Sequence, residues 1–143
     1  MAQIIVSNGF HEGKDQVYDS LLVGDEDEEK LLDFMEPIME NGGNVVDHHT
    51  CDLFPERWFD LVIVLQCNTE CLYDRLVQRG YSQVKVSENM ECEITQVVLE
   101  SAHESYAEEI VVTLPSNSVD DMDSNMSRIA QWYASWCDNN NYI

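Results

Sequence analysis

Hydrophobic residues recur along the chain with two spacings, which predict strands that alternate with helices. The uninterrupted apolar run at 61–65 is typical of a strand covered on both faces, and we predict a central strand near 60–67. Runs rich in β-branched residues predict further strands at 3–6, 44–48 and 109–114.

In the stretches between these strands, apolar residues recur with the spacing of a helix. Acidic residues from Asp25 onward suit the positive end of a helix dipole and predict a helix that begins there and ends at the glycines 42–43. Pro37 lies inside it and predicts a bend or an early end. Thr69 is expected to cap a helix to Gln78, and a polar loop should separate it from a helix over 89–106. In the last helix, the residues expected to pack inward are Met122, Met126, Ile129, Tyr133 and Trp136.

This alternation is typical of βαβ units and predicts an α/β fold with a mostly parallel sheet. The chain has 143 residues, of which 44% are hydrophobic, enough for one core, and we expect a single domain over 1–143. Its longest apolar run is far shorter than the ~20 residues that a membrane span needs. We therefore expect no membrane-embedded part.

Charge narrows the choice of partners. The chain carries 28 acidic and 7 basic side chains, for a net charge of −21. Such a field repels a nucleic-acid backbone and an anionic membrane, and favours a basic protein as partner. A phosphate-bearing substrate would have to be held by a few local cations and a metal ion.

The cysteines and the N-terminus indicate a compartment. Five cysteines form an odd set without a C-x-x-C pair. The apolar stretch at the N-terminus is too short for a signal peptide and lacks the positive charge that one carries. We expect an intracellular protein with reduced thiols.

Residues 44–59 hold the densest set of chemically active side chains. Asp47 follows a predicted strand, and ligands of open parallel sheets bind at such strand ends, where a carboxylate can hold Mg²⁺ directly or through water. The structural alternative is that Asp47 caps a turn and that His48 and His49 are partly exposed turn residues. Zinc is not favoured, because no third ligand follows at a familiar interval.

The same segment, NVVDHHTCDLFPERWF, resembles a motif of the adenylate kinase isoenzyme 6 family, also called the coilin-interacting nuclear ATPase family. The resemblance continues in family order through 72–76, 79–82, 91–97 and 109–111. It implies a three-layer P-loop nucleoside monophosphate kinase fold that lacks an intact P-loop element. Within it, 1–40 would be a remnant of the P-loop or monophosphate-binding region, and 78–88 the lid.

The resemblance also implies an activity and its residues. ATP with Mg²⁺ would serve as cofactors for phosphoryl transfer to AMP or for ATP hydrolysis, in the nucleus and cytoplasm, during maturation of the small ribosomal subunit and beside a basic small-subunit ribosomal protein. Asp47 matches the magnesium-associated acid and His49 the catalytic motif histidine. Arg79 and Lys85 match cations of the lid, and Arg57 a substrate-binding residue. Without the resemblance, Arg79 is better explained as a solvated arginine at a helix C-terminus.

The chain departs from the family at several positions. His48, Thr50 and Leu53 replace the family's Tyr, Gly and Phe, and Val84 replaces a lysine of the lid. None of these replacements alone removes activity, but the loss of the lysine lowers the positive charge over the phosphates.

The family's Gly-x-x-x-x-Gly-Lys-Ser/Thr loop has no intact copy, and two alignments remain open. In the first, which we favour because it leads collinearly into the acidic helix, residues 10–13 match the monophosphate-binding region and the chain starts after the P-loop. In the second, residues 8–15 are a decayed P-loop in which Gly13 and Lys14 would bind phosphate and Asp15 replaces the magnesium-binding hydroxyl. Either alignment weakens the phosphate cradle. Two hypotheses follow: a nucleoside monophosphate kinase or ATPase, and a catalytically impaired binding module for a basic ribosomal protein.

Overall fold

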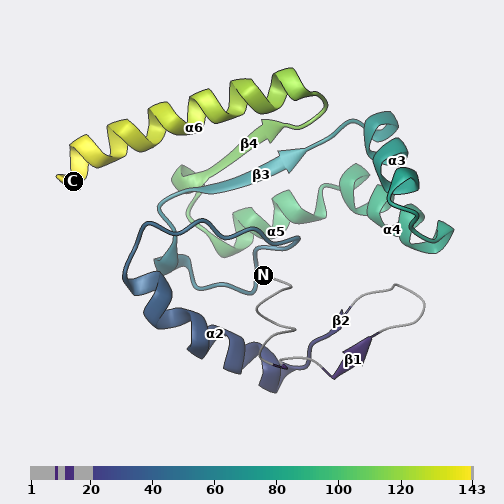
Figure 1. Ribbon diagram of the computed structural model, residues 1–143, viewed down its shortest axis with the longest axis horizontal. Coiled ribbons are helices and arrows are strands. Elements are labelled where there is room, and N and C mark those ends of the chain that lie inside the picture. Colours follow the sequence, from purple (N-terminus) through teal and green to yellow (C-terminus); the bar gives the residue numbers. More distant parts are fainter. Residues whose placement is uncertain (1–8, 10–11, 15–20, 143) are drawn as a thin grey trace.

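A computed structural model describes residues 9, 12–14 and 21–142 of the chain, and the expected strand at 3–6 lies outside them (Figure 1). The elements, in order, are β1 (Gly13–Lys14), β2 (Leu21–Leu22), α2 (Asp25–Glu40), η1 (Glu56–Trp58), β3 (Val62–Gln66), α3 (Thr69–Gln78), α4 (Gln83–Ile94), α5 (Val97–Ser105), η2 (Glu108–Ile110), β4 (Val111–Pro115) and α6 (Val119–Asn140).

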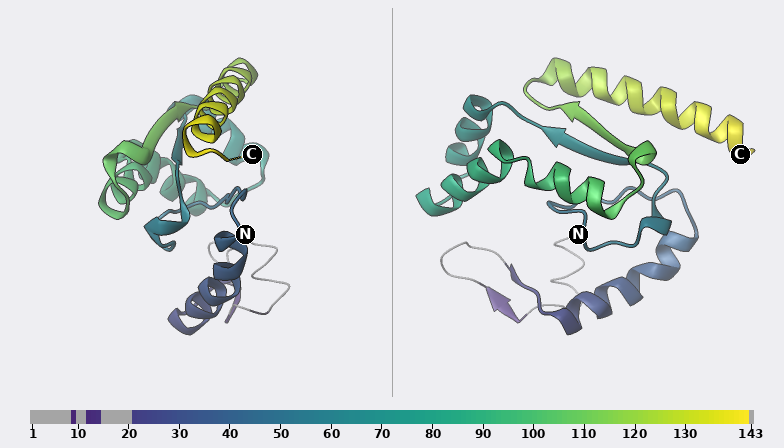
Figure 2. Two further views of the ribbon diagram at one scale, coloured as in Figure 1. Left: turned by 90° about the vertical axis from the view of Figure 1, so that its left-hand side faces the viewer. Right: turned by 180° about the vertical axis from the view of Figure 1, so that it is seen from behind.

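The sheet that organises the molecule is the parallel pair β3 and β4. Val62 lies opposite Val111, and the register continues to Gln66 opposite Pro115. α5 contacts both strands and α6 contacts β4. These two helices flank the sheet on opposite sides (Figure 2). The predicted α/β class with a parallel sheet is confirmed.

The predicted strand at 44–48 is wrong. Residues 42–48 form no regular secondary structure, and the Val45 side chain is 97% exposed. A β-branched run becomes a strand only when a neighbour supplies ladder hydrogen bonds. Within the described residues β3 pairs with β4 alone, so the segment that delivers Asp47 runs as irregular chain.

Two helix ends differ from the expectation. α2 does not end early at Pro37 but continues to Glu40, and buries Leu31, Met35 and Met39. The N-cap of α3 is Asn68 rather than Thr69, because the Asn68 side chain accepts a hydrogen bond from the Cys71 backbone N–H. Both residue types cap helices well, so sequence alone does not separate adjacent candidates.

The helix expected over 89–106 is two helices, and most of the expected polar loop before it is helical. Ser82 caps α4, which starts at Gln83. α4 ends at Ile94, and Gln96 adopts a left-handed conformation with φ 55° before α5 begins. Apolar spacing alone is compatible with one continuous helix, which is why the break was not predicted.

α6 buries only part of the predicted face: Ile129 and Trp136 are half-buried, and the other three residues are exposed. Met122, Met126 and Tyr133 are exposed by 56%, 61% and 49%, whereas Asn125 is buried and donates a 2.6 Å hydrogen bond to the Pro115 carbonyl. Anchoring Asn125 against the end of β4 rotates the methionines outward. Although α6 has 22 residues, no helix in the described part of the chain is long and apolar enough to cross a membrane.

The core consists of two clusters. The first joins α2 to the loop before β3 through Leu31, Met35, Met39 and Phe54. The second packs Val64 of β3 against Ala102 and Tyr106 at the end of α5. Phe59 contacts both, so the loop over 50–59 is held between α2 and the sheet.

Candidate functional site

Two adjoining hollows lie beside β3: the first is at its carboxyl end, where open parallel sheets bind their ligands, and the second runs along the strand. The first, which we name the strand-end hollow, has a volume of about 430 Å³ and lies between the ends of β3 and β4. The second, the histidine hollow, has a volume of about 300 Å³ and lies between β3 and residues 46–49. Gln66, Glu93 and Gln96 line both, so the two hollows are neighbours that share one wall.

The histidine hollow brings together the acid and the histidine that the sequence singled out. Asp47 and His49 line it from the irregular segment after α2, opposite β3. Glu93 of α4 lines it as well, so two carboxylates face the same space. Asp47 is exposed, which leaves its carboxylate accessible to a ligand.

The two histidines have different environments. The Thr50 backbone N–H donates a 3.3 Å hydrogen bond to His48 Nδ1, and the His48 ring packs edge-to-face on Phe54 at 5.3 Å. The His49 ring lies 4.3 Å from that of His48, centroid to centroid. Partial desolvation, followed by the proximity of His48, lowers the pKa of His49. His49 is therefore mostly neutral near pH 7 and able to accept a proton.

Tyr106 anchors the loop that carries these residues. Its hydroxyl donates to the Cys51 carbonyl and, at 3.1 Å, to the Phe54 carbonyl. The side chain is only 4% exposed, and burial raises the pKa of Tyr106 to about 12. A protonated phenol thus ties the motif loop to the end of α5.

The strand-end hollow is bordered by a hydrogen-bonded clamp. Glu93 Oε1 accepts a 2.8 Å bond from the Cys67 backbone N–H, and Asn117 Oδ1 accepts one of 2.7 Å from the Asn68 N–H. Arg75 donates through Nη1 to the Ser116 carbonyl at 2.5 Å and through Nη2 to the Asn117 carbonyl at 3.1 Å. These bonds hold the loop after β3, the loop after β4 and helix α3 in one arrangement.

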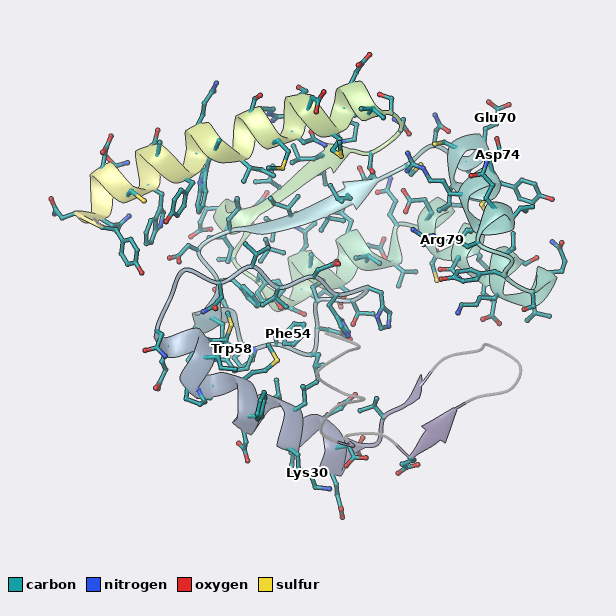
Figure 3. All side chains as sticks on the ribbon, viewed as in Figure 1. Lys30, Phe54, Trp58, Glu70, Asp74 and Arg79 are labelled. Carbon is teal, nitrogen blue, oxygen red and sulfur yellow. The ribbon has the colours of Figure 1, made fainter. Side chains whose placement is uncertain are left out.

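Three cations expected to act on nucleotide phosphates line neither hollow. Arg79 caps the C-terminus of α3 and is exposed, on the α3–α4 side of the molecule (Figure 3). Lys85 lies in α4 with its Nζ 4.1 Å from the centroid of the Tyr81 ring. Arg57 forms an ion pair with Glu36 of α2, with 2.5 Å between Nη2 and Oε2. Their roles toward a nucleotide stay predictions.

Gly13 and Lys14 form β1, which pairs antiparallel with β2. A P-loop places its glycine and lysine at a helix N-terminus, and residues 15–20, where such a helix would begin, lie outside the described residues. Both alignments therefore stay open, because residues 10–11 also lie outside the described part of the chain. The roles of Gly13 and Lys14 in phosphate binding remain untested predictions.

The side chains around the two hollows are better suited to hold Mg²⁺ than to hold a phosphate without a metal ion. Among the described residues there is no group of three or more His, Cys, Asp or Glu side chains suited to a metal. Mg²⁺ is commonly held by one or two carboxylates, with water and substrate phosphates completing its shell, and Asp47 can supply such a carboxylate. The residues described around the two hollows include neither lysine, arginine nor glycine, so a phosphate there depends on the metal for charge compensation.

Sequence reasoning missed Glu93, Arg75 and Asn117. Glu93 and Arg75 lie in segments 91–97 and 72–76, which carry the family resemblance, so their positions were visible although their contacts were not. Asn117 sits in the turn after β4 and has no separate sequence signal.

Comparison with known proteins identifies the family. A family profile described as an AAA domain matches residues 2–96. The chain is 48% identical over 132 residues to an adenylate kinase isoenzyme 6 homolog of Dictyostelium discoideum, a match that covers 92% of this chain and 74% of the relative. Homologs of the same name in Schizosaccharomyces pombe and Drosophila melanogaster are 45% and 42% identical, with 95% and 94% of this chain and 76% and 75% of the relatives covered. On this evidence, together with the parallel sheet and its strand-end site, the chain belongs to the adenylate kinase isoenzyme 6 family of nucleotide-kinase-like proteins.

Proposed function

We propose that the two adjoining hollows bind a magnesium–ATP complex and that the chain transfers a phosphoryl group from it to AMP or to water. The observation that carries this proposal is the convergence of Asp47 and His49 on one hollow beside β3 that adjoins the strand-end hollow. The family relationship supports the proposal, because it suggests nucleotides as substrates and implies the general use of ATP with Mg²⁺.

Each residue would have a separate task. The Asp47 carboxylate would hold Mg²⁺, which supplies the positive charge that the hollows lack. Neutral His49 would accept a proton from the attacking water in hydrolysis, or from a protonated phosphate oxygen of AMP in transfer. Arg79 and Lys85 would approach from the α3–α4 side, where cations neutralise charge on the transferring group. Arg57 would have to leave Glu36 before it could bind a substrate.

We expect binding to be weak and turnover slow. Phosphoryl transfer is catalysed mainly by positioning and electrostatics, and the described lining of the site offers phosphates no glycine-rich cradle. Turnover should therefore fall well below about 1 per second, the lower end of the ordinary kinase range.

The test is magnesium-dependent ATP hydrolysis and AMP phosphorylation by the purified chain and by two variants. Asp47→Asn should abolish any residual turnover, whereas Asp60→Asn, a matched change at an exposed carboxylate that lines neither hollow, should leave it unchanged. Turnover that survives Asp47→Asn would overturn the assignment of Asp47. Ordinary kinase rates in the wild type would show that the phosphate site is more complete than we propose.

A second function rests on the charge of the molecule. A net charge of −21 and the absence of cations from the described lining of both hollows favour an acidic binding module for a basic small-subunit ribosomal protein. In this form the chain would act in small-subunit maturation, in the nucleus and cytoplasm, without turning over ATP. Binding of a lysine- and arginine-rich ribosomal protein that is unaffected by Asp47→Asn, in a chain without measurable turnover, would support this second function over the first.

A further inference from the structure

Two cysteines meet at the rim of the strand-end hollow. Cys67 follows the last residue of β3 and lines the hollow, and Cys71 lies in the first turn of α3. Arg75 contacts Cys67 Sγ, and Arg75 and Cys71 Sγ both donate to the Asn117 carbonyl, which places the two thiols in one cluster. Both are half-buried, so they are sheltered without being sealed from small solutes.

Both sulfurs belong to the clamp that joins the two strand ends. Cys71 Sγ donates to the Asn117 carbonyl at 3.1 Å, and Arg75 Nη1 donates to Cys67 Sγ at 3.4 Å. Arg75 also donates to the Ser116 and Asn117 carbonyls. The thiol pair therefore borders the loop after β4 on one side and the strand-end hollow on the other.

We propose that Cys67 and Cys71 form a redox-active dithiol that closes reversibly to a disulfide by exchange with a small-molecule disulfide such as oxidised glutathione. Two protein thiols are oxidised and the glutathione disulfide is reduced to two glutathione thiols. Reversible disulfides of this kind are the form in which intracellular proteins usually carry them.

Disulfide formation takes two thiol–disulfide exchange steps, and the environment of the cysteines decides which sulfur reacts first. The Cys71 thiolate attacks one sulfur of oxidised glutathione and releases the first glutathione thiolate, which takes up a proton. Burial raises the pKa of the Cys67 thiol, which keeps Cys67 protonated during that step. Cys67 then loses its proton to solvent, attacks Cys71 Sγ in the mixed disulfide, and releases the second glutathione. The nearby Arg75 guanidinium stabilises the Cys67 thiolate as it forms.

Closure of the disulfide changes the site. It removes the S–H group that Cys71 donates to the Asn117 carbonyl and links the end of β3 covalently to α3. The loop after β4 then keeps its bonds to Arg75 but loses one contact. We expect backbone amides near Asn117 to exchange hydrogen faster in the oxidised chain.

One tryptic peptide reports whether Cys67 and Cys71 are joined by a disulfide. Trypsin cleaves after Arg57 and Arg75, and the peptide over 58–75 contains Cys67 and Cys71 and no other cysteine. The whole chain is equilibrated in buffers of oxidised and reduced glutathione, alkylated and digested. In the oxidising buffers we expect this peptide to be unalkylated and lighter by two hydrogen atoms, and a reductant to restore both alkylation sites.

Variants separate the pair from general thiol chemistry. Cys67→Ser should trap glutathione on Cys71, because the resolving thiol is gone, whereas the matched control Cys92→Ser should leave closure unchanged, although Cys92 is the exposed cysteine. The proposal is overturned if the wild-type peptide stays doubly alkylated while Cys92 takes up glutathione. It is also overturned if Cys67 or Cys71 pairs with another cysteine or another chain.

Discussion

The hydroxyl of Tyr106 bonds two carbonyls of the motif loop at a buried position, which makes its contribution measurable. Tyr106→Phe leaves the Cys51 and Phe54 carbonyls without this donor, and an unsatisfied buried polar group costs about 1–3 kcal/mol. We expect the free energy of unfolding, measured by urea denaturation, to fall by that amount. Tyr73→Phe, at a residue that is 45% exposed, should change it by less than about 0.5 kcal/mol. Equal stabilities of the two variants would contradict the anchoring role.

The pKa of Tyr106 gives a second prediction. Folding raises the pKa of this phenol from its ordinary value of 10 to about 12, so the folded chain keeps a proton that the unfolded chain loses. Its stabilising contribution is complete below pH 10 and is lost as the pH rises through 12. Between about pH 9 and pH 11, the stability advantage of wild type over Tyr106→Phe should shrink by about 1 kcal/mol. If the stability advantage of wild type stayed constant over that interval, the phenol would ionise as freely in the folded protein as in the unfolded chain.

At this scale the sequence predicted residue types better than contacts. Asp47 and His49 were predicted from a strand end and a family motif, and both line one hollow. The same motif included Arg57, whose guanidinium pairs with Glu36, 21 positions earlier in the chain. That pairing depends on how α2 packs against η1, which no local pattern encodes. The bonds of Arg75 to the loop after β4 were hidden for the same reason, since they join residues 41 and 42 positions apart.

Among the elements, the break between α4 and α5 carries local strain. Gln96 has φ 55°, a conformation that costs an L-residue with a Cβ about 1–2 kcal/mol and glycine little. We expect Gln96→Gly to raise the free energy of unfolding by about 0.5–1 kcal/mol after the greater flexibility of the unfolded chain is counted. The same change at Gln131, inside α6, should lower it by about 1 kcal/mol. Equal destabilisation by both changes in a urea titration would contradict the left-handed geometry.

The sequence predicted the presence of helices and strands better than it predicted where each one begins and ends. The apolar run at 61–65 led to β3, and the acidic run from Asp25 led to α2. The strand expected at 44–48 failed because strand formation depends on a neighbour that the local sequence does not specify. α6 was predicted with its methionines inward, but the hydrogen bond from Asn125 to Pro115 sets its rotation. A hydrophobic pattern gives the period of a helix and does not show which polar residue finds a buried partner.

For the whole molecule, the charge of −21 predicts how a basic partner binds. Exposed charges attract over a distance that salt shortens, from about 30 Å at 0.01 M to about 8 Å at physiological ionic strength. The affinity for a lysine- and arginine-rich ribosomal protein should therefore fall steeply between low and physiological salt, measured by titration calorimetry. An uncharged osmolyte at matched osmolarity serves as the control and should leave the affinity unchanged. Binding that does not respond to salt would remove charge as its main cause.

The register of the parallel sheet has a consequence for how the chain acquires its structure. Every residue of β3 pairs with one that follows 49 positions later, since Val62 lies opposite Val111. Helices α3, α4 and α5 lie between the two strands and form through local contacts, which are faster than long-range strand pairing. During synthesis, β3 is made 49 residues before β4, and until then its apolar residues have no strand to pair with. We therefore expect nascent chains that end before Val111 to be the stage at which this protein depends most on chaperones.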